Sequence, residues 1–538
     1  MSKEKIYIAG AFLIGIAYRL LMGLQGIDST DMGFCMTFYQ NVFTHPEAMP
    51  FYFNYYLTGL IGGLWHMLLG QFGLLGFRLL ETLTLTAAIG LLYLAFRPRF
   101  TSAKTPAVAV LLSFLFPSII VTFHYDTLSF LLIAASVYFL SRWHRGGYVV
   151  WLTLAGMMIG LSFFARIING FLFLLILFPL FWGWQRSRRR AFDDIAYFGV
   201  GMLVGCAASI ALMVLLGHLP YFGAALSEAF GSLYGHNNSS GVLIGSYLKS
   251  YVNIALQILA IAAMALYFGD GDHLAPKLKA IVRTVMIAAL TVLIFTSQAY
   301  LSAVAVCTLM IVITRRPHPL TFYALACAYL FPLGSTVGIP SLFHWCGGLL
   351  IIPAASCYKR FTSQWQRTVI CLVSLLIAAN MVYKMGTHAY GEEEPRTKTL
   401  TRALPGTLNV MTTAERAENY RNVVARIQEY GKDNPWLLVA NQASEFYYAT
   451  GRLPFTGNTQ MAAFMGEALT SRLDYHHRLY GRLPLIAFLQ RSHDSDDMAE
   501  FREGLIPWMR QQGYRLVYHD NDVELYDLKE ENHDTDNR

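Results

Sequence analysis

Three aspartates suited to proton transfer or cation binding stand in polar stretches between long apolar segments. Asp28 and Asp31 follow the first apolar segment, within residues 25–70, which contain no Lys or Arg. Asp126 lies in a second stretch, HYDTL, between two further apolar segments. If these segments cross a membrane, a carboxylate at its edge loses hydration at a cost in free energy, which favours a role as catalytic base or cation ligand. The structural alternative is that each aspartate caps the helix that follows it.

Polar residues near these aspartates form a candidate substrate-binding set. The set comprises His45, Glu47, His124, Tyr125, His236 and Asn237. The last two lie in GSLYGHNNSSG, a polar and glycine-rich sequence within residues 217–250. That stretch is long enough to fold over a pocket, and a simple connector is the alternative.

A few basic residues stand on the side of the chain that is otherwise poor in Lys and Arg. Arg78 lies at the start of the second apolar segment, Arg166 in FFARIING, and His344 in FPLGSTVGIPSLFHW. Arginine offers planar, paired donors that match a phosphate group, so we expect phosphate binding here. The alternatives are snorkelling to lipid headgroups and pairing with a nearby acid.

The same acids provide ligands for a hard cation. Asp28, Asp31 and Asp126, together with Glu47, offer oxygen ligands that suit Mg²⁺ or Mn²⁺, and the sequence leaves metal dependence open. Other enzymatic signatures are missing: there is no Gly-rich loop ending in Lys-Ser/Thr, no Gly-x-Ser-x-Gly and no His-Glu-x-x-His. The seven cysteines lie mostly in apolar stretches without metal-like pairing.

The composition excludes an ordinary soluble enzyme. Of 538 residues, 55% are hydrophobic and only 14% are charged, whereas a soluble domain is about one-quarter charged. The chain is therefore expected to be a polytopic α-helical membrane protein. The net charge of +7 is explained by loop charges and predicts no nucleic-acid partner.

About thirteen apolar segments are long enough, or nearly so, to be transmembrane helices. They are residues 5–24, 72–96, 105–123, 127–141, 148–165, 168–184, 194–216, 251–269, 280–298, 301–314, 319–333, 341–357 and 366–384. The first is expected to be a retained helix, with a signal peptide as the alternative. Pro50–Leu69 is aromatic and glycine-rich, which favours a helix lying in the membrane interface.

Lys and Arg cluster on one set of connecting loops, as they do on the cytoplasmic side of a membrane. We therefore expect a multi-pass protein of the inner (plasma) membrane with a cytoplasmic amino terminus. Residues 1–384 form the predicted membrane domain, and 385–538 a predicted extracytoplasmic α/β domain with a disordered tip at 529–538.

Within the soluble part, periodicity predicts helices at 412–431, 459–470 and 497–513. Apolar runs predict strands at 436–440 and 485–489, and residues 514–528 read as a hairpin around Asp520-Asn521.

These features resemble the GT-C superfamily of integral-membrane glycosyltransferases, most closely the aminoarabinose transferase and protein O-mannosyltransferase type. The resemblance is carried by the acidic loop with Asp28 and Asp31, the Pro50–Leu69 segment, FRLLETL with Arg78, HYDTL with Asp126, and GLSFFARIING with Arg166. It departs from the common pattern where many members have Asp-Glu or Glu-Asp, because this chain has Asp-Ser-Thr-Asp.

The resemblance implies transfer of a sugar from a polyprenyl-phosphate donor to a hydroxyl of a lipid, glycan or protein acceptor, with inversion. Asp31 is the expected general base with Asp28 as the second candidate, and Asp126 would orient the acceptor or bind a cation. Arg166, with Arg78 or His344, would stabilise the leaving phosphate.

Other classes of protein fit parts of the same sequence. They are a transporter or flippase of an envelope substrate, a scaffold whose external domain binds a partner, and a ligase of whole glycans. The acids stand at one predicted boundary and the halves of the chain do not repeat, which counts against a transporter.

Overall fold

The computed structural model describes most of the chain. The described residues are 3–28, 31–115, 122–179, 188–232, 240–263, 275–296, 299–314, 318–335, 338–340, 346–361, 363–389, 392–440, 443–459, 467–490 and 496–528.

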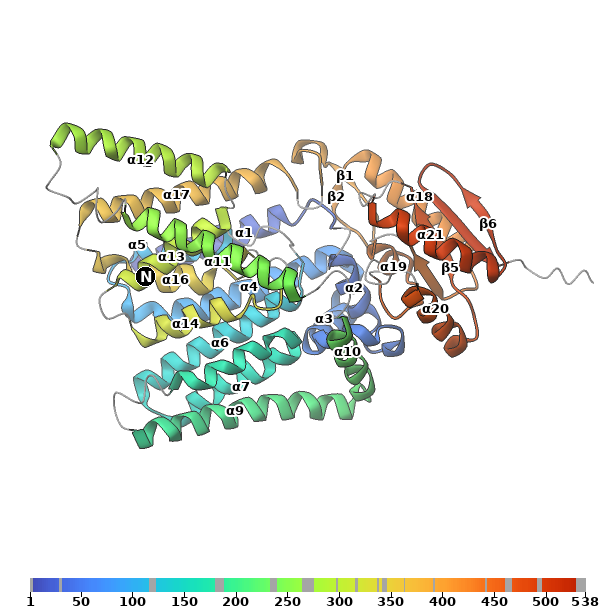
Figure 1. Ribbon diagram of the computed structural model, residues 1–538, viewed down its shortest axis with the longest axis horizontal. Coiled ribbons are helices and arrows are strands. Elements are labelled where there is room, and N and C mark those ends of the chain that lie inside the picture. Colours follow the sequence, from blue (N-terminus) through green and yellow to red (C-terminus); the bar gives the residue numbers. More distant parts are fainter. Residues whose placement is uncertain are drawn as a thin grey trace, which may run out of the picture.

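Long apolar helices lie side by side along one axis and form the larger part of the molecule (Figure 1). They are α1 (Lys3–Met22), α4 (Gly73–Phe96), α5 (Lys104–Leu115), α6 (Tyr125–Gly146), α7 (Val149–Ala165), α9 (Arg188–Leu215), α11 (Ser240–Ala262), α12 (Pro276–Thr296), α13 (Ala299–Ile313), α14 (Pro319–Leu330), α16 (Gly348–Cys357) and α17 (Gln364–Thr387). A 3₁₀ segment, η5 (Ile167–Leu177), follows α7.

Each of the thirteen predicted apolar segments overlaps one of these elements. Among the described residues, five helical stretches are long and apolar enough to cross a membrane, and several others are shorter. The chain is thus a multi-pass membrane protein, but the predicted number of about thirteen spans is not confirmed.

Glycines let α7 and α9 approach closely. A Cβ at Gly156 or Gly160 of α7 would overlap carbonyl oxygens of α9, and one at Gly201 or Gly205 of α9 would overlap carbonyl oxygens of α7. Both pairs have the four-residue spacing that brings small residues onto one helix face. This contact fixes α7, and therefore the position of Arg166, which directly follows it.

Short helices cover one end of the bundle (Figure 1). They are α2 (Asp31–Asn41), η1 (Pro46–Ala48), η2 (Pro50–Tyr55), α3 (Tyr56–Leu69), η3 (Gly70–Phe72) and α10 (Leu219–Ser232); η4 (Arg97–Arg99) and η8 (Tyr358–Arg360) lie elsewhere in the chain. The Pro50–Leu69 segment is therefore helical, as η2 followed by α3. Gly59 and Gly62 of α3 pack against the rings of Phe38 and Tyr39 of α2.

The C-terminal region, residues 392–528, is an α/β unit beyond these short helices (Figure 1). Its elements are η9 (Arg396–Lys398), β1 (Thr401–Arg402), β2 (Met411–Thr412), α18 (Ala414–Tyr430), β3 (Trp436–Val439), α19 (Glu445–Thr450), β4 (Leu453–Pro454), α20 (Glu467–Tyr480), β5 (Leu485–Leu489), α21 (Asp496–Gln511), β6 (Tyr514–His519) and β7 (Val523–Leu528). The main sheet has the order β4-β3-β5-β7-β6, in which β3 pairs in parallel with β4 and β5 while β7 pairs antiparallel with β5 and β6.

The predicted strands and hairpin of this region match β3, β5, β6 and β7. The helix predicted at 459–470 overlaps α20 at 467–470, and α20 continues to Tyr480. Residues 460–466 of that prediction lie outside the described residues. The short helix α19 was not predicted, because six residues are too few to show helical periodicity. The predicted disordered tip also lies outside the described residues.

The C-terminal region and the short helices share one hydrophobic core. Ile27, Phe34 and Phe53 from the membrane part belong to the same buried cluster as Tyr420 and Phe446. Backbone hydrogen bonds reinforce the contact, including Leu74 N to Thr407 O at 2.8 Å. Ile27, next to Asp28, and α2, which begins at Asp31, are therefore both packed against the α/β unit.

Candidate active site

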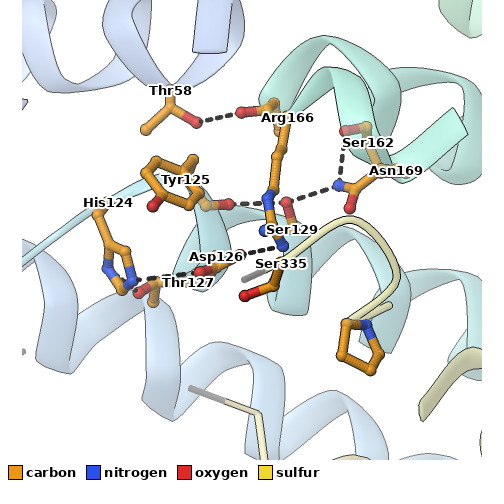
Figure 2. Close-up of polar contacts among 12 residues, drawn as sticks. Thr58, His124, Tyr125, Asp126, Thr127, Ser129, Ser162, Arg166, Asn169 and Ser335 are labelled. Atoms are coloured by element: carbon orange, nitrogen blue, oxygen red, sulfur yellow. Dashed lines mark hydrogen bonds and ion pairs between the residues drawn. The ribbon is translucent and has the colours of Figure 1, made fainter. Parts of the chain in front are cut away.

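A buried ion pair joins the start of α6 to the end of α7. Arg166 Nη1 donates to Asp126 Oδ1 at 2.8 Å, and the two side chains are 7% and 4% exposed (Figure 2). Asp126 is in the first turn of α6, where a carboxylate also interacts favourably with the helix dipole. Among the described residues, only Nη1 of Arg166 hydrogen-bonds a side chain, so Nε and Nη2 are the donors left for a substrate anion.

Asn169 holds the two helix ends together. Its Nδ2 donates to Ser129 Oγ at 2.7 Å and to Ser162 O at 2.8 Å, and Ser129 Oγ in turn donates to Tyr125 O at 2.7 Å (Figure 2). This short chain of hydrogen bonds runs from the residues after α7 to the residue before Asp126. It fixes the distance over which the ion pair forms.

Aromatic rings surround the guanidinium of Arg166. It lies 5.3 Å from the ring centroid of Tyr125 and 5.6 Å from that of Phe331. Tyr125 stacks on Tyr55 with centroids 4.2 Å apart. The loop after α14 lies beside the pair, with Ser335 near the guanidinium in Figure 2, and its backbone N–H donates to Tyr247 Oη at 2.9 Å.

His124 is buried next to the pair without being part of it. Its Nδ1 is 3.0 Å from Thr122 O and from Thr127 Oγ1, and its Nε2 is 3.8 Å from Asp126 Oδ2. Burial lowers the pKa of His124 to about 3, so the ring is neutral at pH 7. A neutral ring at this distance orients Asp126 weakly at most.

The acids of the first loop have different environments. Asp28 is buried, and its Oδ2 accepts a hydrogen bond from Met32 N at 3.3 Å, the capping role that is the structural alternative for it. Asp31 is the first residue of α2 and is partly exposed. Phe34, one turn after Asp31 on α2, stacks on Tyr125 with ring centroids 6.3 Å apart. The start of α2 therefore lies beside the residue that precedes Asp126, and a catalytic role for Asp31 stays a prediction.

Arg78 is placed differently from Arg166. Its two terminal nitrogens donate to the backbone carbonyls of Gly23, Gln25 and Gly26. These bonds anchor the chain between α1 and Asp28. The hydrogen bonds that Arg78 makes to these carbonyls therefore stabilise the fold. A contact of Arg78 with phosphate stays a prediction.

His45 and Glu47 do not join this cluster. His45 and Glu47 hydrogen-bond each other at 3.2 Å on the exposed surface, beyond the far end of α2, a helix about 16 Å long from 11 residues. His236, Asn237 and His344 lie outside the described residues.

Several neighbours of the site were missed by the sequence reasoning. Asn169 stands three residues after Arg166 in ARIING. That spacing places two side chains on the same side of a helical turn, so it could have identified Asn169 as a neighbour of Arg166. Arg19 and Glu81 lie 3.6 Å apart and are almost fully buried between helices α1 and α4. Arg19 and Glu81 both lie inside predicted transmembrane segments, where a charged side chain is usually paired with a group of opposite charge.

The sequence left metal dependence open, and the described residues offer no ready set of ligands for Mg²⁺ or Mn²⁺. Within that part of the chain, no three His, Cys, Asp or Glu side chains gather as metal ligands. Asp126 is bound to Arg166 and Asp28 to the amide of Met32.

Comparison with protein families identifies one match. Residues 56–216 match the family described as dolichyl-phosphate-mannose-protein mannosyltransferase, which belongs to the GT-C superfamily. The predicted resemblance is confirmed, and the match supports a membrane glycosyltransferase that uses a lipid-linked sugar donor. The matched range contains Arg78, Asp126 and Arg166 but begins after Asp28 and Asp31. No curated protein matches the chain.

Proposed function

We propose that this chain transfers a sugar from a polyprenyl-phosphate donor to a hydroxyl group of an acceptor, at the end of the helix bundle that carries Asp31, Asp126 and Arg166. The observation that supports it most is the buried Asp126–Arg166 pair, beside which the helix that begins with the partly exposed Asp31 packs through Phe34 on Tyr125. Such a donor keeps its chain in lipid and its sugar phosphate at the membrane surface, where these helix ends would lie.

The reaction is a single displacement. The acceptor oxygen forms a bond to the anomeric carbon, while the bond from that carbon to the phosphate oxygen breaks and leaves its electron pair on the phosphate. The anomeric configuration is inverted. Asp31 takes the acceptor proton, because it is the accessible acid of the cluster.

Arg166 stabilises the charge that develops on the leaving phosphate. Its Nη1 is held by Asp126, which orients the guanidinium and leaves the other donors toward the substrate. Tyr125 and Phe331 exclude water from its faces, which strengthens the interaction with phosphate.

The side of the membrane follows from the loop charges. The loops rich in Lys and Arg are proposed to be cytoplasmic, which puts the Asp31 cluster and the C-terminal region on the extracytoplasmic face of an inner (plasma) membrane. Residues 1–384 are then the catalytic membrane domain and 385–538 an external domain. The acceptor is a lipid, glycan or protein hydroxyl.

A detergent assay separates transfer from transport. Purified full-length protein would be incubated with polyprenyl-phosphate-linked hexose or pentose, together with envelope lipid and glycan extract as acceptor. We expect release of polyprenyl phosphate matched by labelled product, although no transmembrane gradient exists. Binding of the donor without any cleavage would favour the alternative, a transporter or flippase.

A further inference from the structure

A cavity lies at the end of the helix bundle that is opposite to the Asp126–Arg166 pair. Asp126 is in the first turn of α6, whereas Tyr138, Arg142 and Arg145, which line the cavity, are in the second half of that helix. With 22 residues, α6 is about 33 Å long, so the cavity is separate from the candidate active site. Its volume of about 510 Å³ is in the range of ligand pockets, about 300–1,000 Å³.

Three segments of the chain bring polar side chains to this cavity. They are Glu4 of α1, Arg97 of η4, Thr101 and Ser102 after η4, and the three residues of α6. Three arginines therefore stand against one glutamate, which leaves an excess of two positive charges. A hollow lined mainly by one sign of charge attracts ions of the opposite sign.

The one acid of the cavity is already bound to one of its arginines. Glu4 Oε1 accepts a hydrogen bond from Arg97 Nε at 3.0 Å and another from Tyr93 Oη at 3.1 Å. These bonds orient Arg97 through its Nε alone. Its two terminal nitrogens make no hydrogen bond among the described residues and are available to a ligand.

Arg145 is oriented by its own helix. Its Nε donates to Ser141 O at 3.1 Å and its Nη2 to Ser141 Oγ at 2.7 Å. Ser141 Oγ in turn donates to Ala95 O at 3.0 Å, which joins the end of α6 to the end of α4. A side chain that is oriented before binding loses less conformational entropy when a ligand arrives.

Arg142 and Ser102 add further donors. Arg142 is three residues before Arg145, a spacing that places both side chains on one face of α6. Its guanidinium lies 5.4 Å from the ring centroid of Trp151 and makes no hydrogen bond among the described residues. Ser102 Oγ accepts a hydrogen bond from Lys104 N at 3.3 Å, so its own hydroxyl proton is free to be donated.

We propose that this cavity binds the phosphate group of an anionic ligand, with Arg97, Arg142 and Arg145 as its charged donors. Guanidinium groups match phosphate oxygens with short, charge-assisted hydrogen bonds. Basic pockets between membrane helices on the cytoplasmic side hold anionic lipid headgroups, and the loop charges put this end of the bundle on that side. A lipid headgroup and a free phosphate compound offer the same chemistry. The site does not depend on the proposed function, because it lies at the other end of α6.

Lipid binding by the purified full-length protein in detergent tests one source of the phosphate. Native mass spectrometry would give the Kd of the first bound phosphatidylglycerol, with phosphatidylcholine of the same acyl chains as the neutral control. We expect phosphatidylglycerol to bind more tightly to the wild type. Arg142→Gln and Arg145→Gln should each weaken its binding about fivefold, and the double variant about 25-fold. Phosphatidylcholine binding should not change.

Two other variants separate charge in the cavity from effects on folding. Arg283 also stacks on a tryptophan, 4.3 Å from the ring centroid of Trp365, but it does not line the cavity. Arg283→Gln should therefore bind phosphatidylglycerol like the wild type. Glu4→Gln removes the one negative charge of the cavity, so it should tighten binding about fivefold. Loss of folding cannot produce tighter binding.

Inorganic phosphate tests the other source. The unfolding temperature would be measured as phosphate replaces chloride at constant ionic strength, because a ligand of the folded state raises it. A phosphatidylglycerol preference that the double variant removes identifies a lipid headgroup. A rise in unfolding temperature that the double variant removes, without that preference, identifies a free phosphate compound, and either result supports the proposal. Equal behaviour of the double variant and the wild type toward both probes, or an equal loss in Arg283→Gln, would overturn it.

Discussion

The helix ends and the α2–α19 contact both bury an acid, but they stabilise it in opposite ways. Asp126 at the helix ends has an ion pair with Arg166. Glu445 at the contact has the hydroxyl of Tyr420 and no ion pair among the described residues. An ion pair offsets part of the free-energy cost of burying a charge, which a hydroxyl partner alone does less well. The helix ends thus hold a buried ion pair, whereas the α2–α19 contact holds a buried carboxyl without one among the described residues.

The largest expected effect concerns the acid at the junction of the two regions. Asp31→Asn should lower the rate of sugar transfer about 10²–10⁴-fold, because the acceptor loses its general base. Initial rates in detergent would measure this, with Asp433→Asn as the matched exposed control. If Asp31→Asn transferred sugar as fast as the wild type, Asp31 would not be the general base, and the α2 helix would have no part in proton transfer.

A second test concerns the fixed pair. Arg166→Gln should destabilise the protein by about 3–5 kcal/mol, because it leaves Asp126 charged and unpaired in a buried site. The double variant Arg166→Gln with Asp126→Asn should recover part of this loss in thermal unfolding, while transfer stays low in both. Equal stability of the single and double variants would mean that Asp126 does not depend on Arg166.

The smallest expected effect concerns the link between the regions. Gly33→Ala puts a Cβ into the backbone of Glu445 and should cost about 1–3 kcal/mol, a typical value for overpacking. It should also raise hydrogen exchange in residues 31–41. Gly386→Ala is the matched control, since a Cβ there would meet nothing within 4 Å. If hydrogen exchange of residues 31–41 in Gly33→Ala equalled that of the wild type, the close contact with α19 would not be needed to hold α2 in place.

Local patterns were sufficient for much of the fold. Apolar runs located the helices of the bundle and the strands β3 and β5, and the turn residues Asp520-Asn521 located the β6–β7 hairpin, because these signals depend on neighbours in the chain. The chemistry-bearing residues Asp31, Asp126 and Arg166 were also singled out, since charged residues are conspicuous among apolar ones. Local patterns could not distinguish Arg78 from Arg166, since only contacts reveal that Arg78 binds three carbonyls.

The sequence by itself determined that this is a multi-pass membrane protein with acids and arginines between its apolar segments, because hydropathy and charge are properties of composition and order. Only the tertiary structure decided which of them meet. Asp126 and Arg166 are 40 residues apart, and Ser444 lies 407 residues beyond Thr37. Such contacts depend on how whole helices pack, and in particular on glycines such as Gly33 and Gly156 that allow close approach.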